Sequence, residues 1–552
     1  MISAVSSHSE SAIDTLSDAS IVLAFEPVGP GHVEVLANLF ARNALPAVTE
    51  GFDPFPLTLA QAQQIALAPR KDAYYVAFSD GQAVGFSMLR GFDEGYEVPS
   101  FGIFVDHEHH ALGIGRRLTE WTIEQARLRR CPAMRLSVYS TNLVAHRLYR
   151  LLGFSEQDRE PIERDGRMEE KVVMKLDLTD KNNGRRRIPV AAPALVGRER
   201  EYVLDCLDST WISSSGRYLE RFEAAFAEFC GVRYAIACCN GTVAVHLALL
   251  AHEVGPGDEV IVPTLTYVAT ANPVVYCGAR PVFVDSEPHT WNMDPDRVAA
   301  AITPRTRGIV VVHLYGHPVD MDPILELAKR HKLWVIEDAA EAHGARYQGR
   351  IAGSMGSLST FSFYGNKIIT SGEGGMVITD DERLASLVRQ LHGQGQDPQR
   401  RYWFPMVGFN YRMTNIEAAI GLAQLERIDW HLGRRREIAG WYREELADED
   451  GIELSPQAPW AESSFWIMCA VLDESRFGQR DDVMASLEED GIETRPFFYP
   501  LHTLPMYQPL NEGRRFPVAE DLARRGINLP SSAMLTRQDV AYVCERLRGL
   551  KR

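Results

Sequence analysis

A polar, basic segment about one third of the way along the chain constrains the fold more than any other feature of the sequence. This segment, Thr179-Asp-Lys-Asn-Asn-Gly-Arg-Arg-Arg187, has no apolar periodicity and has the composition of a linker. A chain of 552 residues is also too long for one ordinary domain. We therefore predict two blocks that fold separately, over residues 21–178 and 188–552, with a linker over residues 179–187.

The first block combines hairpins with single helices, which predicts an α+β domain over residues 21–178. It opens with a helix-like stretch from Gly31 and closes with a hairpin that turns at Asp165–Gly166. The elements expected in between are a hairpin of Ala73–Ser79 and Ala83–Leu89, a strand over Ser100–Val105, a helix that ends near Arg130, a strand over Met134–Tyr139 and a helix over Leu143–Leu152. We expect residues 1–20, rich in Ser, Ala and Asp, to be disordered.

The second block alternates short apolar runs with helical stretches, a pattern typical of α/β architecture. The clearest strand candidates are Glu259–Val262, Pro281–Asp285, Gly308–Val312 and Leu333–Glu337. After about residue 430 the elements become fewer and more mixed. We predict a large domain over residues 188–430 and a smaller C-terminal subdomain over residues 431–552.

Asp338 follows the apolar strand that begins at Leu333. Ligands of open parallel sheets bind beyond the carboxyl ends of the strands, and a carboxylate buried there is costly unless it is paired. A binding role for Asp338 competes with a simple alternative, in which its side chain caps the turn at Ala339–Ala340.

Lys367 lies between a strand-like run, Thr360–Tyr364, and a glycine-rich bend, Ile368–Gly375. Burial in such a place lowers the pKa of the amine and makes it a usable nucleophile for a Schiff base. Taken alone, a salt bridge at an interface explains this lysine better than a catalytic role does.

The third candidate element is Asn240-Gly-Thr242, which precedes the helical stretch Val243–Leu250. Small residues at a helix start expose backbone N–H groups, and the helix dipole favours a phosphate there. Ordinary capping by Asn240 or Thr242 is the alternative. Together, an amine at Lys367, an anion at Asp338 and a phosphate cradle at Gly241–Thr242 match the three needs of pyridoxal phosphate (PLP).

Several long segments of the second block, in order, resemble the DegT-type sugar aminotransferases over residues 188–550. These segments are Gly257–Thr264, Glu337–His343, Phe361–Lys367, Gly372–Gly375 and Gly408–Thr414. The resemblance implies a type I aminotransferase fold with PLP as cofactor. It implies that Lys367 binds the cofactor covalently and shuttles a proton, and that Asp338 pairs with the ring nitrogen.

The same resemblance implies further cofactor contacts. Glu341 would lie near the ring face or its hydroxyl, and Tyr267 would stack on the ring. The phosphate contacts implied are Gly241, Thr242, Val243 and Ser362, with Asn410 contributed by a second subunit of a homodimer that shares its active sites.

Within this family, segments such as Phe363–Ile369 and Arg401–Asn415 are most similar to enzymes that move an amino group from glutamate to C4 of GDP-4-keto-6-deoxy-mannose. The expected substrate is therefore a nucleotide-linked 4-keto-6-deoxy sugar. A dTDP- or UDP-linked sugar is the alternative, because no base-reading residue stands out in the sequence.

The loop His110-Ala-Leu-Gly-Ile-Gly115 of the first block lies between a strand and a helix and precedes Arg116. Consecutive N–H groups at such a junction suit a pyrophosphate, although a plain strand-to-helix turn explains the loop equally well. The order of elements, with Asn142–Tyr149 and Gly153–Phe154, resembles the GNAT acyl-CoA N-acyltransferases over residues 22–176. The family's loop normally begins with Gln or Arg, and this chain has His110 instead.

The GNAT resemblance implies an acyl-CoA cosubstrate. The residues implied to contact it are Val105, His110, Leu112, Gly113, Ile114, Gly115, Arg116, Asn142 and Tyr149. Tyr149 would protonate the leaving thiolate. Glu97, at the start of the central strand, would deprotonate the amine through a water molecule. An exposed acid at the end of a strand is the ordinary alternative for Glu97.

Charge and cysteine content narrow the classes of partner. A net charge of −16 argues against nucleic acid or an anionic membrane as the main partner. The eight cysteines form no Cys-x-x-Cys pair, so we expect no metal site and a reduced, cytoplasmic protein. No signal peptide and no apolar run of membrane-spanning length is evident in the sequence.

The sequence therefore predicts a bifunctional enzyme that forms an amino sugar and then acylates the new amine. One alternative keeps the aminotransferase and makes the first block a non-catalytic binding or regulatory module. A scaffold with a decayed site is disfavoured, because Lys367 and Asp338 are both present.

Overall fold

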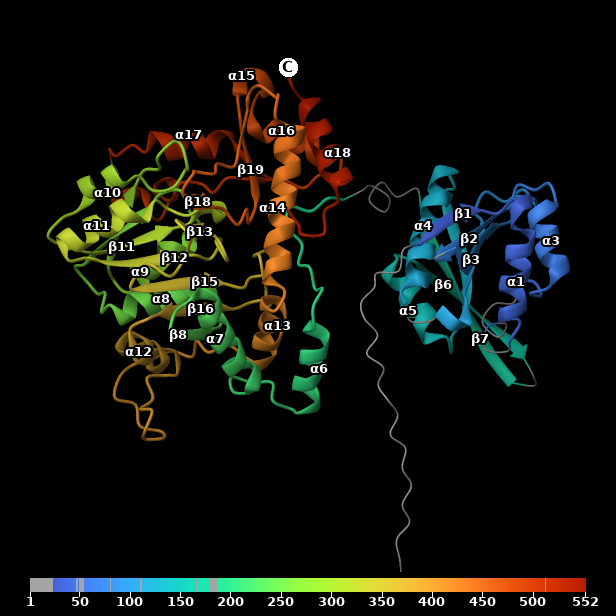
Figure 1. The fold of residues 1–552 in the computed structure, drawn as a ribbon, viewed down its shortest axis with the longest axis horizontal. Coiled ribbons are helices and arrows are strands. Elements are labelled where there is room, and N and C mark those ends of the chain that lie inside the picture. The colour runs from blue at the N-terminus through green and yellow to red at the C-terminus, as the bar shows by residue number, and fades with distance from the viewer. Residues whose placement is uncertain are drawn as a thin grey trace, which may run out of the picture. The chain divides into compact units, whose positions relative to one another are not determined.

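The computed structural model describes residues 23–178 and 187–552, apart from residues 46, 47, 49–53, 80, 110, 111, 165, 166 and 512. The chain divides between Arg185 and Arg186 into two compact units, drawn from blue to teal and from green to red in Figure 1. The N-terminus predicted to be disordered and residues 179–186 of the predicted linker lie outside the described residues.

The first unit is built on a seven-stranded sheet with the order β1-β2-β3-β4-β5-β7-β6. Its strands are β1 (Ala24–Pro27), β2 (Ala73–Ser79), β3 (Gln82–Arg90), β4 (Ser100–Val105), β5 (Ala133–Tyr139), β6 (Ser155–Arg164) and β7 (Arg167–Asp177). Its helices are α1 (Val33–Asn43), α3 (Leu59–Leu67), α4 (Ile114–Leu128) and α5 (Leu143–Leu151). The predicted strands and helices of this block are confirmed to within two residues, but β1 and α3 were not predicted.

Helices cover both faces of this sheet, as the alternation of side chains along β2 shows. Tyr74 and Val76 pack in one core with residues of α1 and α3. Tyr75 packs in a second core with residues of α4, and Ala77 in a third that also contains α4 residues. Because successive side chains of a strand point to opposite faces, one apolar strand can serve cores on both sides.

The second unit has a seven-stranded sheet with the order β10-β9-β11-β12-β15-β16-β8. These strands are β8 (Tyr234–Cys238), β9 (Glu259–Pro263), β10 (Arg280–Val284), β11 (Thr306–Val312), β12 (Trp334–Asp338), β15 (Leu358–Ser362) and β16 (Gly375–Thr379). From β10 to β15 the neighbours run parallel, whereas β16 runs antiparallel to both β15 and β8. The four predicted strands are confirmed, and so is the α/β class.

A smaller sheet with the order β17-β19-β21-β20 forms from the C-terminal part of the chain. Its strands are β17 (Ile452–Leu454), β19 (Met468–Leu472), β20 (Arg495–Pro496) and β21 (Gly526–Leu529), and the short strands β13 (Arg346–Tyr347), β14 (Arg350–Ile351) and β18 (Ala461–Glu462) form a separate sheet. The long helix α14 (Ile428–Glu445), orange in Figure 1, spans the position at which we expected the large domain to end. The domain boundary near residue 430 therefore stays a prediction.

The remaining helices of the second unit surround these sheets. They are α6 (Glu199–Asp208), α7 (Arg217–Cys230), α8 (Gly241–Ala251), α9 (Asn272–Tyr276), α10 (Pro295–Ala301), α11 (Met321–His331), α12 (Glu382–His392), α13 (Asn415–Leu425), α15 (Glu474–Phe477), α16 (Arg480–Glu489), α17 (Pro517–Arg525) and α18 (Arg537–Arg548). The largest core joins residues of α7, α8 and α13 to the strands of the seven-stranded sheet. This core holds the strand ends that carry the candidate site.

Glu337, near the end of β12, is fully buried and stabilises the loop that precedes β15. Its carboxylate accepts hydrogen bonds from the backbone N–H groups of Gly353, Met355 and Gly356 at 2.7, 2.6 and 2.5 Å. The ring Nε2 of His313 lies 2.9 Å from it. Burial alone would raise the pKa of this carboxyl, but His313 and the N–H groups lower that pKa below its ordinary value.

Replacement of Glu337 by alanine is expected to reduce the free energy of unfolding of the second unit by about 3–5 kcal/mol. The variant leaves three buried N–H groups and His313 without their acceptor. Urea denaturation followed by tryptophan fluorescence measures this loss, because Trp121 is the only one of nine tryptophans outside the second unit. Glu326→Ala, which removes an exposed ion pair with Arg330 on α11, is the matched control and should change stability by about 0–1 kcal/mol.

Candidate active site

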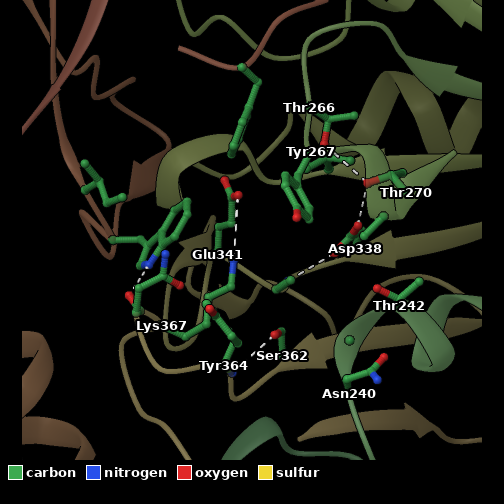
Figure 2. Close-up of a pocket in the computed structure, with 18 of the residues that line it drawn as sticks. Asn240, Thr242, Thr266, Tyr267, Thr270, Asp338, Glu341, Ser362, Tyr364 and Lys367 are labelled. Carbon is green, nitrogen blue, oxygen red and sulfur yellow. Dashed lines mark hydrogen bonds and ion pairs between the residues drawn. The ribbon is translucent and has the colours of Figure 1, made fainter. Parts of the chain in front are cut away.

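A cavity of about 600 Å³ lies at the carboxyl ends of the parallel strands of the second unit (Figure 2). Val312, Asp338 and Ser362 line it from the ends of β11, β12 and β15. Segments that lie more than a hundred residues further along the chain add Arg495, Asn528 and their neighbours. The cavity is therefore built jointly by the seven-stranded sheet and the C-terminal part of the chain.

Lys367 projects into this cavity from the loop that follows β15 (Figure 2). Its Nζ lies 3.8 Å from Oε1 of Glu341 and 3.9 Å from the ring centroid of Trp466. Burial lowers the pKa of the amine, and the carboxylates of Glu341 and Asp338 oppose that shift. The ion pair considered from the sequence is thus present, but inside a cavity, where a buried amine is available as a nucleophile.

Asp338 holds its carboxylate at the end of β12 through two hydrogen bonds. Thr270 donates its hydroxyl to Oδ2 at 2.7 Å, and the backbone N–H of Ala340 donates to Oδ1 at 3.2 Å. Asp338 therefore caps the turn, as the sequence suggested, and also lines the cavity. Burial raises the pKa of Asp338, while Thr270 and the N–H of Ala340 hold it down.

Glu341 lies close to Lys367 and Asp338, and its two carboxylate oxygens have different partners. Oε2 accepts the backbone N–H of Tyr315 at 2.8 Å, and Oε1 faces Lys367. Burial raises the pKa of Glu341 to about 7, although the charge of Lys367 lowers it. A carboxyl with this pKa can exchange a proton near neutral pH.

The helix start predicted to hold a phosphate lies on the cavity wall. Asn240 caps α8, and its Oδ1 accepts the N–H of Val243 at 3.0 Å. Gly241, Thr242 and Ser362 line the cavity, whereas Val243 does not. Gly241 lets the helix start approach the end of β15 closely, because a Cβ at its position would lie only 2.8 Å from Cβ of Ser362. The first-turn N–H groups of a helix have no partner within the helix and suit an anion.

Two other predicted contacts lie at the rim of the site or outside it. Tyr267 lines the cavity and is 58% exposed, and its ring centroid is 5.7 Å from that of Phe498. Asn410 is exposed, forms a backbone bridge with Gly393 and is not among the cavity-lining residues of this chain.

Sequence reasoning missed Trp466, Arg495 and Asn528, which line the cavity from the C-terminal part of the chain. Arg495 donates to Oε1 of Glu493 through both Nε and Nη2, at 3.2 and 2.9 Å. No local pattern singles these residues out, since each follows ordinary apolar or loop sequence. Only the packing of this part on the large sheet brings them into the cavity that holds Lys367.

In the first unit, α4 begins directly after Gly113, whose φ of 74° lies in the left-handed region that favours glycine. Leu112 is about half exposed, and Ile114 and Gly115 form the first turn of the helix. Arg116 pairs with Glu120 at 2.8 Å on the exposed face. His110 lies outside the described residues.

The parallel strands β4 and β5 pair only at Ser100 and Arg135, so they separate toward Val105 at the end of β4. This opening leads to the start of α4. Such a gap leaves room for an extended ligand beside the N–H groups of the helix.

The residues predicted to act near the thioester and the amine in the first unit differ in burial and in their hydrogen bonds. Tyr149 is buried against Phe101 and Phe154, and burial raises the pKa of its hydroxyl well above the ordinary value, so it stays protonated. Asn142 caps α5, since its Oδ1 accepts the N–H of Ala145 at 3.1 Å. Glu97 is exposed in the loop before β4.

Three general features of the described residues bear on partners and chemistry. All eight cysteines are free. Within the ranges that the structure describes, no cluster of three or more His, Cys, Asp or Glu is arranged to hold a metal ion. None of the described helices is long and apolar enough to cross a membrane.

The fold and the site define the second unit as a PLP-dependent aminotransferase, with an amine, a carboxylate and a helix start at one sheet edge. Residues 193–548 match the model of the DegT/DnrJ/EryC1/StrS aminotransferase family, and residues 39–154 match that of the acetyltransferase (GNAT) family. The chain belongs to the DegT/DnrJ/EryC1/StrS family of sugar aminotransferases and carries an N-terminal GNAT domain.

Named relatives match the second unit. A GDP-perosamine synthase of Caulobacter vibrioides is 56% identical over 362 residues, which cover 65% of this chain and 97% of the relative. One of Escherichia coli O157:H7 is 49% identical over 360 residues, with 65% and 97% covered. The solved structure of DesI in the presence of its TDP-sugar product is similar with a TM-score of 0.61 and 35% identity, covering 67% of this chain and 95% of that one.

Replacement of Gly241 by alanine is expected to weaken PLP binding by about tenfold or more, because the added Cβ would collide with Cβ of Ser362 and push the helix start away from Ser362. Titration of the cofactor-free chain with PLP, followed by absorbance, measures the dissociation constant. Gly440→Ala in α14 is the control, since its Cβ would meet nothing within 4 Å. Equal affinities for the two variants would contradict a phosphate site at the start of α8.

Proposed function

We propose that the second unit transfers an amino group from glutamate to C4 of a nucleotide-linked 4-keto-6-deoxy sugar. The best candidate is GDP-4-keto-6-deoxy-mannose, which would become GDP-perosamine. The observation that carries this proposal is the buried amine of Lys367 between Glu341 and Trp466, close to Asp338. The similarity to GDP-perosamine synthases supports the choice of sugar nucleotide.

PLP supplies an electrophilic carbonyl carbon and a ring that accepts electrons when its nitrogen is protonated. The residues of this cavity suit such a group. Lys367 provides the amine that holds it and that then moves a proton to and from the reacting carbon. Asp338, fixed by Thr270, provides the negative charge for the ring nitrogen. The first turn of α8, with Thr242, and the hydroxyl of Ser362 bind the phosphate.

Other proposed roles complete the site. Glu341 lies near the ring and the lysine, and its pKa of about 7 suits proton exchange. Tyr267 stacks on the ring from the rim of the cavity. Arg495 presents a guanidinium group to a carboxylate or phosphate of a substrate.

We propose a homodimer with shared active sites as the working form. Asn410 is exposed and stays outside the cavity of its own chain, so its proposed phosphate contact requires a second subunit. Exposed aromatic residues nearby in the sequence, Tyr402, Trp403 and Phe404, supply apolar surface for such a contact. We place this enzyme in the cytoplasm, with no membrane or nucleic acid as a partner.

For the first unit we propose transfer of an acetyl or other acyl group from acyl-CoA to the amine of the sugar. The amine nitrogen bonds to the thioester carbon, the C–S bond breaks, and the amine loses a proton through water to Glu97. The thiolate takes a proton from Tyr149, whose raised pKa keeps it protonated. Gly113, Ile114 and Gly115 at the start of α4, with Val105, Leu112, Arg116 and Asn142, form the proposed acyl-CoA contacts.

A binding or regulatory role for the first unit is the second candidate. The side chain of Asn142 is engaged in the cap of α5, and Glu97 is exposed in a loop. In that case the unit binds acyl-CoA or the amino sugar without turnover.

Replacement of Lys367 by alanine is expected to abolish the visible absorbance of the bound cofactor and to reduce amino transfer by about a thousandfold or more. Acyl transfer should continue. The measurement is the absorbance spectrum before and after glutamate, together with the yield of amino sugar. Lys329→Ala, on the exposed face of α11, is the control. Normal amination by the Lys367 variant would refute the cofactor assignment.

Acetyl-CoA and GDP-perosamine together are expected to release free CoA in the presence of the purified chain. Tyr149→Phe should slow that release by about a hundredfold, because it removes the proton donor but keeps the ring in its packing. Tyr96→Phe, in an exposed position, is the control. Binding of acetyl-CoA in a calorimeter without release of CoA would favour the regulatory candidate.

A further inference from the structure

The ammonium end of Lys367 lies on the face of an indole ring. Its Nζ is 3.9 Å from the ring centroid of Trp466, and only 12% of the lysine side chain is exposed. Cation–π attraction is strongest with tryptophan and grows when water is excluded. It acts on the protonated amine and not on the neutral one, so this contact selects the charged form of Lys367.

Several contacts fix the position of the ring. The indole Nε1 of Trp466 donates to the backbone oxygen of Asn366 at 2.7 Å, which ties the ring to the residue before the lysine. The ring of Tyr315 stacks beside it with centroids 6.3 Å apart and planes 18° apart. The backbone N–H of Tyr315 also donates to Glu341, so Tyr315 contacts both the indole ring of Trp466 and the carboxylate of Glu341.

The charged groups around Lys367 favour its protonated form. Glu341 and Asp338 both stabilise the protonated amine electrostatically. His343, fully buried nearby, has its pKa lowered to about 3 by burial and by the charge of Lys367, so it stays neutral. Burial of Lys367 opposes its protonation, and an aromatic face offsets part of that cost without adding a second negative charge.

We propose that the face of Trp466 and the carboxylate of Glu341 form a docking site for the protonated Lys367 ammonium, which holds the lysine in the cavity whenever its nitrogen is not bonded to the cofactor. Trp466 is then a positioning residue, since it acts through the lysine. This inference rests on the role proposed for Lys367. A lysine that must be released and re-bonded in each cycle needs such a defined position for its free, proton-carrying state.

A purely space-filling role for Trp466 predicts the opposite response to mutation. If the ring only excludes water, its removal hydrates the amine and raises its pKa toward the ordinary value of 10.5. If the ring docks the ammonium, its removal lowers that pKa. The sign of the change therefore separates the two roles.

The test is competitive labelling of amines with trace acetic anhydride over a range of pH, on the full-length chain freed of cofactor. The peptide that contains Lys367 is quantified by mass spectrometry, and the midpoint of its labelling gives the pKa. Trp466→Leu is expected to lower this midpoint by about one pH unit. Trp466→Phe keeps a smaller aromatic face and should fall between the leucine variant and the natural chain.

Trp460→Leu is the matched control, because Trp460 packs on Tyr347 and His317 and does not line the cavity. Its midpoint should equal that of the natural chain. An unchanged or raised midpoint in both folded Trp466 variants would overturn the docking site. The natural chain could fail to develop the cofactor absorbance when PLP is added, while Trp466→Leu still lowers the labelling midpoint of Lys367. That result would refute the role proposed for Lys367 and leave the docking site standing.

Discussion

Two neighbouring carboxylates at the end of β12 determine how the second unit is organised. Because side chains alternate along a strand, Glu337 points into the protein and Asp338 toward the cavity. The first accepts hydrogen bonds from the loop before β15, which sets the start of the strand that leads to Lys367. The second remains available at the cavity wall, held by Thr270. One buried strand thus supplies both a structural anchor and a binding group.

The cavity depends on a second constraint, the packing of distant segments against this sheet edge. Lys367 comes from the loop after β15, whereas Trp466 lies a hundred residues away from Asn366, which it contacts. Burial lowers the pKa of Lys367 and raises that of Glu341 to about 7, so the two pKa values move toward each other. Both shifts arise from burial, so the packing that closes the cavity also sets its chemistry.

The two units are chemically related. An amine is the product of the reaction proposed for the second unit and the class of acceptor proposed for the first. In the first unit, the gap between β4 and β5 and the start of α4 provide the features expected of an acyl-CoA site. The buried Tyr149 has the protonation state that its proposed role requires.

Local sequence was sufficient for the elements and for the residues at their ends. The apolar run before Glu337 predicted β12 and the position of Asp338, and the small residues at Gly241 predicted the start of α8, because backbone pattern and capping act over a few residues. The short elements β1 and α3 escaped prediction, since they carry little periodicity. The sequence alone therefore determined the class of each unit and the order of the candidate groups. Only the tertiary structure placed Trp466 beside Lys367 and brought Arg495 into the same cavity, because contacts between distant segments depend on packing that no local pattern records.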